Sequence, residues 1–399
     1  MSAKPAVWIT GLGVASPAGV GVDALWARLR APDPQGLLVE RPPAREGLSV
    51  PPAVCFPREL PAEEWVDPRR VRKASGLSRL TLVAAQLAWQ DAGGLPAAVK
   101  DEAATVVGTT LGSSDYYLRF YEALLRRGPK AANAVLFTEG VFNAPSGHLS
   151  AAHGLRGFGH TLVGGEEAGL SAALLARDRI VLGRARAALC GGAEAYCDLA
   201  HASLWREERV GGRLAGVGAF GPGAFAEGAC LAVLERADDA RARGARGYAE
   251  LLAGSRRRSA SDDPAAFDQA LGDVLGEAGL GRADLDLLVV DACSGSRAQR
   301  LTDIAFLEFF PDAGEHHAWA PMAGIGEGFA FGSALALASA ALALHHGVVC
   351  PTHGEARQPC YSDFGPCMAR EPLERPLRHA LVVSASEPGA VVMAVLRKV

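Results

Sequence analysis

The sequence predicts an α/β protein made of two similar halves, and two observations lead to this prediction. Short apolar stretches typical of strands, such as residues 7–10, alternate along the chain with longer helical patterns, such as residues 22–29 and 78–92. This alternation favours a mixed or largely parallel sheet that is covered by helices. The second observation is a weak internal echo, by which we mean a similarity between two segments of the chain: AATVVGTTL at 103–111 resembles DLLVVDACS at 286–294.

The echo continues further along the chain and predicts where the two halves meet. AALCGGAE at 187–194 is answered by ALVVSASE at 380–387, and the joint falls near RARGAR at 241–246. We therefore expect an N-terminal half at 1–245 and a C-terminal half at 246–399. A unit that occurs only twice indicates two halves packed face to face rather than a solenoid.

Composition and charge exclude several classes of protein. The 399 residues are 49% hydrophobic and 21% charged, as in globular proteins, and the net charge of −4 provides no basic field for nucleic acid or anionic lipid. The most apolar stretch, 329–344, is shorter than the roughly 20 residues that span a bilayer, so we expect a buried helix there and no membrane span. No secretory leader is recognisable, so we expect a cytoplasmic protein whose eight cysteines are free thiols.

Two stretches have little regular pattern. Residues 31–61 are rich in proline and predict a surface excursion without chemistry. Residues 197–225 are rich in glycine and arginine, and they separate two strands that are nearly adjacent in the second half.

Two motifs suggest a cofactor site or a metal site, but neither has the residues and spacing that such a site requires. Gly11-Leu12-Gly13 follows a strand, yet Ser16 stands where a dinucleotide fingerprint requires its third glycine. The group formed by Cys350, His353, Cys360 and Cys367 has no zinc-site spacing. We therefore expect no cofactor and no metal.

A set of short motifs spread over the chain has the order and spacing of the β-ketoacyl synthases. The motifs are VWITGLGVASP at 7–17, QDAG at 90–93, VGTT at 107–110, NAPSGH at 143–148, GGAEA at 191–195, AEGA at 226–229 and HGVVCPT at 346–352. Over nearly its whole length the chain resembles this family of the thiolase-like superfamily. The resemblance implies a thiolase-like fold, in which two similar βαβαβαββ halves pack as a layered α-β-α-β-α sandwich.

The family's catalytic cysteine and two histidines are missing from the corresponding positions. Glu166 stands where the resemblance implies the cysteine at a helix N-terminus, and Cys293 stands at the first histidine position. Glu327 stands at the second one, although a slip of two residues would put Ile325 there. The family's glycine-rich C-terminal loop corresponds to SASEPG at 384–389.

These losses do not depend on details of the alignment, because the residue types are absent from whole regions. The chain has no cysteine between Cys55 and Cys190, no histidine between His201 and His316 or between His317 and His345, and no lysine between Lys130 and Lys398. A carboxylate is a poor acyl acceptor compared with a thiolate, because the mixed anhydride it would form is more reactive than the incoming thioester. We therefore expect no condensation by this chain alone.

The roles of the replacement residues stay open at this stage. Cys293 is either a displaced nucleophile or a buried structural thiol. Glu166 and Glu327 are either an acid/base pair or partners of an arginine such as Arg297.

A ketosynthase-like chain without a nucleophile resembles the chain-length factors of type II polyketide synthases. The resemblance implies a heterodimer with an active β-ketoacyl synthase and, as a further partner, an acyl carrier protein that bears acyl or malonyl chains. Glutamine is usual at the nucleophile position of these factors, so Glu166 fits better with polyene or aryl-polyene pathways. The strand formed by His160, Thr161, Leu162 and Val163 would then pair across the two-fold axis of the dimer.

The resemblance also implies a gate that closes the partner's acyl tunnel. Its positions correspond to Ser114, Tyr117 and Tyr121, which share one helix face because they follow i, i+3, i+7 spacing. Plain interface packing by the same aromatic stripe is the alternative. For the whole chain, the alternatives are a malonyl-carrier decarboxylase, an acyltransferase with a non-standard site, or a homodimeric acyl-carrier-binding protein.

Overall fold

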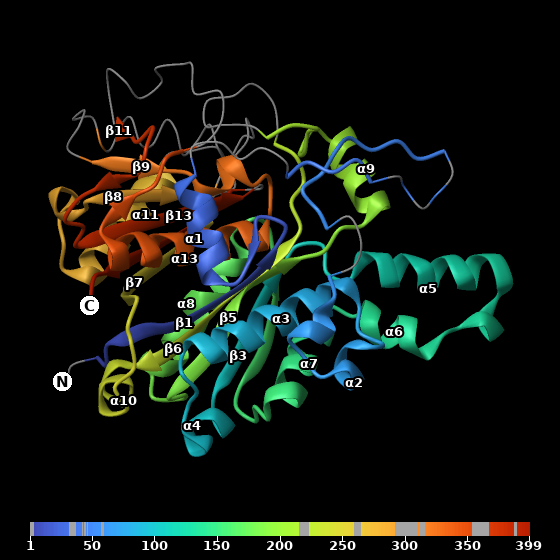
Figure 1. Ribbon diagram of the computed structural model, residues 1–399, viewed down its shortest axis with the longest axis horizontal. Coiled ribbons are helices and arrows are strands. Elements are labelled where there is room, and N and C mark those ends of the chain that lie inside the picture. The colour runs from blue at the N-terminus through green and yellow to red at the C-terminus, as the bar shows by residue number, and fades with distance from the viewer. Residues whose placement is uncertain are drawn as a thin grey trace.

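The fold is seen in a computed structural model (Figure 1). It describes residues 4–31, 37–41, 43, 45, 47–56, 60–214, 223–258, 265–291, 310, 316–352, 367–386 and 389–399. None of the helices in these ranges is long and apolar enough to cross a membrane.

A large mixed sheet of two sets of five strands forms the centre of the molecule. The N-terminal set runs in the order β4 (Gly159–Val163), β3 (Ala104–Thr109), β5 (Ala187–Glu194), β6 (Gly228–Arg236) and β1 (Val7–Ser16). The C-terminal set runs in the order β9 (His317–Trp319), β8 (Leu287–Val290), β13 (His379–Ser386), β14 (Ala390–Arg397) and β7 (Ala249–Arg258). In each set three parallel strands are followed by two antiparallel ones, so the structure contains the repeat that the sequence echo indicated.

The two sets join through β1 and β7, which pair antiparallel at Trp8 with Glu250 and at Ile9 with Ala249. Short strands add to the edges and loops. They are β2 (Gly19–Val20), which pairs with β1, β11 (Cys367–Met368), which pairs with β9, and the separate pair β10 (Val348–Val349) and β12 (Leu373–Glu374).

Helices complete the predicted five layers. The middle layer consists of α8 (Ala168–Val181) and α13 (Ala330–His346), which contact each other and strands of both sets. On the outer face of the N-terminal strands lie α3 (Gly76–Asp91) and α7 (Ala144–His153), and α11 (Ala265–Ala278) covers the outer face of the C-terminal strands. The expected thiolase-like layered fold is therefore confirmed, whereas the exact division at residue 245 stays a prediction.

The remaining helices lie around these layers. They are α1 (Val22–Arg30), α2 (Pro68–Val71), α4 (Ala97–Asp101), α5 (Ser114–Arg127), α6 (Ala134–Gly140), α9 (Asp198–Arg206) and α10 (Ala237–Ala242), with short 3₁₀ helices at Ala62–Glu64, Pro129–Ala131, Arg282–Asp284 and Pro321–Gly324. Contacting helices α5 and α6 extend away from the body of the molecule (Figure 1).

The two irregular stretches are more ordered than the sequence indicated. Within residues 31–61, Val54 is fully buried and bridges to Ala226, and Ala53 bridges to Val39. The surface-excursion prediction was therefore wrong for this part, because apolar residues between prolines can add a short bridge to a buried loop without any periodic pattern. The stretch 197–225 contains α9.

Glycines allow the middle layer to pack unusually closely. A Cβ atom added to Gly169 on α8 would lie 2.0 Å from the backbone oxygen of Ala330, and one added to Gly192 on β5 would lie 1.9 Å from the same oxygen. Both distances are far below van der Waals contact, so only glycine lets α8 and β5 approach the first turn of α13.

Gly169→Ala should therefore lower the free energy of unfolding by about 1–3 kcal/mol, as overpacking of a tight interior does. The matched control is Gly272→Ala on α11, where an added Cβ meets nothing within 4 Å. That change should raise the free energy of unfolding by about 0.5–1 kcal/mol, because alanine favours the helix. Urea unfolding of both variants measures the difference, and equal stabilities would contradict the packing argument.

Candidate functional site

The candidate site lies where α8 begins, at the carboxyl end of β4. Glu166 sits in the turn between these two elements and is half-buried, with 18% of its side chain exposed. Its Oε1 accepts a hydrogen bond of 2.8 Å from Nη2 of Arg209, and the two groups form an ion pair. Because a helix N-terminus favours negative charge, both the helix and the guanidinium stabilise this carboxylate.

Further carboxyl groups surround Glu166. Burial raises the pKa of Glu166, and the charge of Arg209 opposes this shift. Burial also raises the pKa of Asp291 well above its usual value; the charges of Glu327 and Glu166 raise it further, while a hydrogen bond from Ser384 opposes the rise. The site is thus a buried cluster of carboxyl groups. When one of them binds a proton and loses its charge, the ionised form of its neighbours becomes more favourable.

Glu327 lies before the first turn of α13, close enough to Asp291 for its charge to raise the pKa of that group. The backbone of Glu327 forms an isolated β-bridge with Phe225. The side-chain Oε1 of Glu327 accepts a hydrogen bond of 3.1 Å from the backbone N–H of Phe329. Phe329 is fully buried and has φ 48°, a backbone conformation that is strained for a non-glycine residue. The Arg209 guanidinium lies 5.4 Å from the centre of the Phe329 ring, whereas Ile325 belongs to the hydrophobic core.

The charges of Glu166 and Glu327 both act on Asp291, so the structure brings together two of the three positions at which the resemblance implies catalytic residues. The third, Cys293, and the candidate cation Arg297 lie outside the described residues. The arginine that does contact Glu166 is Arg209, which comes from the irregular stretch 197–225. Sequence reasoning missed it, because an arginine among many others in a stretch without periodicity carries no signal of its contacts.

A buried histidine lies beside this site. His201 on α9 is fully buried among aromatic rings, with Tyr196 at 5.5 Å and Phe225 at 5.6 Å between ring centres. Within the part of the chain that the structure describes, neither of its ring nitrogens has a hydrogen-bond partner. Burial lowers the pKa of His201 to about 4, so the ring is neutral near pH 7.

The residues of the expected gate lie on α5. Tyr117 and Tyr121 are 50% and 44% exposed, and their ring centres are 4.5 Å apart. Ser114, in the first turn of the helix, donates a hydrogen bond to the backbone oxygen of Leu111. The two tyrosines therefore share one exposed face, while Ser114 is partly buried at the start of the helix.

The residues of the expected dimer interface form β4, which ends the sheet. Among the described strands it pairs with β3 alone, and Val163 is 55% exposed. A groove of about 500 Å³ runs between β4 and α7, and Phe142 and His160 are among its lining residues. The ring of Phe142 also lies against Gly112, so this side chain connects the groove to the turn that precedes α5.

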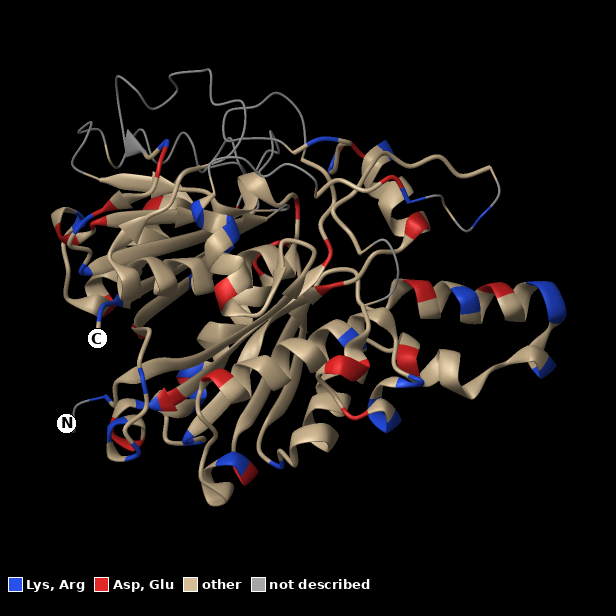
Figure 2. Ribbon diagram, in the orientation of Figure 1, with Lys and Arg blue, Asp and Glu red and all other residues tan. Residues whose placement is uncertain are grey.

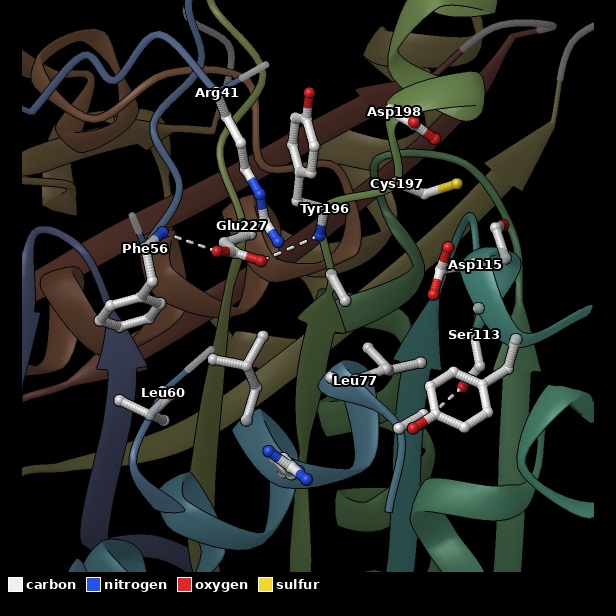
Figure 3. A pocket seen from close by; sticks show the side chains of 18 residues that line it. Arg41, Phe56, Leu60, Leu77, Ser113, Asp115, Tyr196, Cys197, Asp198 and Glu227 are labelled. Carbon is white, nitrogen blue, oxygen red and sulfur yellow. Dashed lines mark hydrogen bonds between the residues drawn. The ribbon is translucent and has the colours of Figure 1, made fainter. Parts of the chain in front are cut away.

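A second pocket, of about 210 Å³, lies on the α3 side of the carboxyl ends of β3 and β5 (Figure 3). Glu227 accepts hydrogen bonds from the backbone N–H groups of Phe56 and Tyr196, at 2.7 and 2.9 Å. The carboxylate thereby holds three chain segments together. Because these contacts satisfy both of its oxygens, we assign Glu227 a structural role.

The fold and the site together define a protein of the ketosynthase type, and comparison with family models agrees. Residues 4–240 match the model described as "Beta-ketoacyl synthase, N-terminal domain". The chain therefore belongs to the β-ketoacyl synthase family.

Individual proteins are similar over different lengths of the chain. The tetracenomycin polyketide synthase ketoacyl synthase beta subunit of Streptomyces glaucescens is 29% identical over 89% of both chains. The 3-oxoacyl-acyl-carrier-protein synthase 2 of Rhizobium meliloti (strain 1021) is also 29% identical, but the match spans 62% of each chain. Among solved structures, the ishigamide ketosynthase/chain length factor has a TM-score of 0.89 with 24% identity over the full length of both chains, a likeness that concerns the fold.

The neutral, unpartnered state of His201 gives a prediction about pH. Its pKa in the folded protein, about 4, is below the usual 6.5, so its contribution to stability is complete above pH 6.5 and is lost as the pH falls towards 4. This loss should reach about 2 kcal/mol at pH 5. In His201→Phe, the free energy of unfolding should therefore fall less between pH 7 and pH 5 than in the unaltered protein. If chemical unfolding shows that the free energies of unfolding of the two proteins change in parallel with pH, the ring is not buried in its neutral form.

Proposed function

We propose that this chain is a non-condensing subunit that pairs with an active β-ketoacyl synthase in type II polyketide biosynthesis. In this role it shapes the acyl tunnel of its partner and sets the length of the chain. The observation that carries the proposal is Glu166, which is ion-paired with Arg209 at the start of α8, where the family resemblance puts the cysteine nucleophile.

The chemistry of that position supports a passive site. Condensation requires a thiolate that accepts the acyl chain, and Glu166 offers only carboxylate oxygens, one of which is bound to Arg209. Glu327, at a histidine position of the family, accepts a hydrogen bond where a thioester carbonyl would require a donor. Loss of one such donor typically costs about 2.7–4 kcal/mol of transition-state stabilisation.

The outer surface supports pairing with another chain. An edge strand such as β4 exposes backbone groups that a partner strand can bond, and proteins usually protect such edges. Large apolar side chains gather beside it on α5, α6 and the turn that follows: Tyr117, Tyr121, Leu125, Phe137, Val141 and Phe142 are all at least 38% exposed. An exposed apolar surface of this kind typically marks a protein interface.

Charges border this apolar surface. Figure 2 shows acidic and basic residues alternating along the ribbon of α5, with basic residues at its far end. Within the helix, Arg119 pairs with Asp115 and Arg126 with Glu122, four residues apart in each case. Such pairs keep the polar side of the helix in water, so the tyrosine side is the one available to a partner.

The names of relatives point the same way. The similar tetracenomycin protein is a β subunit of a ketoacyl synthase, and a protein of nearly the same size named as its α subunit is 28% identical over 92% of both chains. We infer that this chain, like a β subunit, works beside a condensing subunit, and that an acyl carrier protein delivers the substrates of that condensing subunit.

The proposal predicts that the chain never becomes acylated. After incubation with an active ketosynthase, malonyl carrier protein and an acyl primer, intact-mass spectrometry should detect the acyl adduct on the ketosynthase and none on this chain. Glu166→Gln should leave product formation within about twofold of the unaltered complex, because the amide oxygen still accepts the hydrogen bond from Arg209. An acyl adduct on this chain, or loss of product from an intact Glu166→Gln complex, would favour the decarboxylase or acyltransferase alternative.

The gate gives a second prediction. If Tyr117 and Tyr121 close the partner's tunnel, Tyr117→Ala or Tyr121→Ala makes room for further carbons, and each buried methylene gains about 0.8 kcal/mol. Mass spectrometry of the carrier-bound products should then show longer chains, whereas Ser114→Phe should shorten them.

Leu125→Ala is the matched control for the gate, because Leu125 is 85% exposed further along the same helix. Because Leu125 belongs to the apolar surface but not to the gate, its loss should weaken assembly, measured by size-exclusion chromatography, and leave chain length unchanged. If the tyrosine variants weaken assembly and leave product length unchanged, the stripe serves interface packing and the gate assignment is wrong.

A further inference from the structure

A buried carboxylate lies where the extended helix pair α5–α6 meets the body of the molecule (Figure 1). Glu139, the last residue but one of α6, is 6% exposed, although its neighbours on this helix are exposed or half-buried. A carboxylate is buried at a tolerable cost in free energy only when other groups bind its oxygens. The contacts of Glu139 therefore show what this side chain holds together.

Both oxygens of Glu139 are bound by other helices. Oε2 accepts hydrogen bonds from the backbone N–H of Ser75 at 2.8 Å and from the hydroxyl of Ser78 at 3.1 Å, at the start of α3. Oε1 accepts a hydrogen bond from Nε2 of His148 on α7 at 2.5 Å. Burial by itself raises the pKa of Glu139, but the hydrogen bonds from His148 and Ser75 outweigh it and lower the pKa, so the carboxyl is ionised near pH 7. The carboxylate thus ties α6 to two helices of the body.

The same group of hydrogen bonds reaches the start of α5. Ser75 and Ser113 are the N-cap residues of α3 and α5, and their Oγ atoms are 3.0 Å apart. An N-cap serine usually accepts a hydrogen bond from an N–H group of its own helix. Within the described helix α5, the hydroxyl of Ser113 caps no N–H group, so it serves the contact with α3 instead. The first turn of α5 is therefore held by the same serine whose N–H binds Glu139.

Helix α6 also sets the position of Tyr117 directly. Gly140 ends α6 next to Glu139, and a Cβ atom added to Gly140 would lie 3.2 Å from the N and Cα atoms of Tyr117. This distance is shorter than ordinary van der Waals contact, so the backbones of α5 and α6 touch at a residue of the expected gate. A shift of α6 therefore shifts Tyr117 as well.

We propose that Glu139 is a positioning residue that fixes the tyrosine face of α5 and thereby sets where the gate closes the acyl tunnel of the partner. The use at the gate rests on the proposed function, whereas the anchoring of α5 is a property of this chain by itself. Glu139 acts through α3 and α6 and does not touch the growing acyl chain.

Hydrogen–deuterium exchange of the full chain, without a partner, tests the anchoring. Glu139→Ala removes the three hydrogen bonds that the carboxylate accepts, and hydrogen bonds to a charged group contribute more than neutral ones. The amides of α5 and α6 should then open locally and exchange about tenfold faster or more. The amides of α11, which covers the C-terminal strands, are the reference and should exchange at an unaltered rate.

Two further variants separate the hydrogen bonds of Glu139 from other effects. In Glu139→Gln, the amide oxygen can accept from Ser75, and the amide N–H₂ can donate to the other tautomer of His148. Exchange in α5 should therefore stay close to that of the unaltered protein. Thr138→Ala is the matched control, because Thr138 is exposed on the same helix and its hydroxyl donates to the oxygen of Ala134 in that helix. It should leave exchange in α5 unchanged.

Gly140→Ala tests the step from α6 to the gate. The added methyl group pushes against the backbone of Tyr117 without removing any contact of Glu139. In the complex with an active ketosynthase, Glu139→Ala and Gly140→Ala should both change the lengths of the carrier-bound products, whereas Glu139→Gln should not. Mass spectrometry measures the lengths, and size-exclusion chromatography confirms that each complex is assembled.

Unchanged exchange in Glu139→Ala would overturn the anchoring, as would an acceleration that Glu139→Gln or Thr138→Ala shows equally, or one that spreads to α11. Faster exchange with unaltered product length, in a complex that responds to Tyr117→Ala, would overturn the role at the gate. If Tyr117→Ala has no effect on length either, the gate of the proposed function is refuted. The exchange rates then still decide whether Glu139 anchors α5, so the two failures are distinguishable.

Discussion

The close contact between helices α8 and α13 is the constraint on which the candidate site depends. The backbone oxygen of Ala330 lies so near Gly169 and Gly192 that no side chain fits between them. This contact fixes the first turns of both helices relative to each other. Glu166 precedes one of these turns, and Glu327 and Phe329 precede the other, so the geometry of the site is set by backbone packing rather than by the polar side chains in it.

The same close packing brings several carboxyl groups together, and Arg209 supplies a counter-charge for them. Two helix N-termini, each favouring negative charge, meet where Glu166, Glu327 and Asp291 are already partly or fully buried. Carboxylates this close cannot all stay ionised without a counter-charge. The guanidinium of Arg209, from outside the helical layers, supplies that charge and lies 5.4 Å from the centre of the Phe329 ring.

The inside and the outer edge of the N-terminal half differ in a way that suits a subunit of a larger complex. At the inner site, Glu166 is paired with Arg209. At the outer edge, β4 leaves one side unpaired within the described sheet, and exposed aromatic side chains on α5 continue its surface. A chain that performs its own chemistry requires an accessible interior, whereas a chain that serves a partner requires an accessible edge.

Local patterns in the chain are enough to predict many of its elements and to show which residue types are missing. The helical patterns at residues 22–29 and 78–92 agree with α1 and α3 to within two residues at each end, and the absence of cysteine between Cys55 and Cys190 excluded a thiol nucleophile before α8. Which groups meet depends instead on the tertiary structure. Arg209 and Glu166 are 43 residues apart, and the stretch that bears Arg209 has no periodic pattern. Val54 likewise becomes buried through a bridge to Ala226, far along the chain. Such contacts follow from how distant segments pack, and neither residue type nor spacing encodes them.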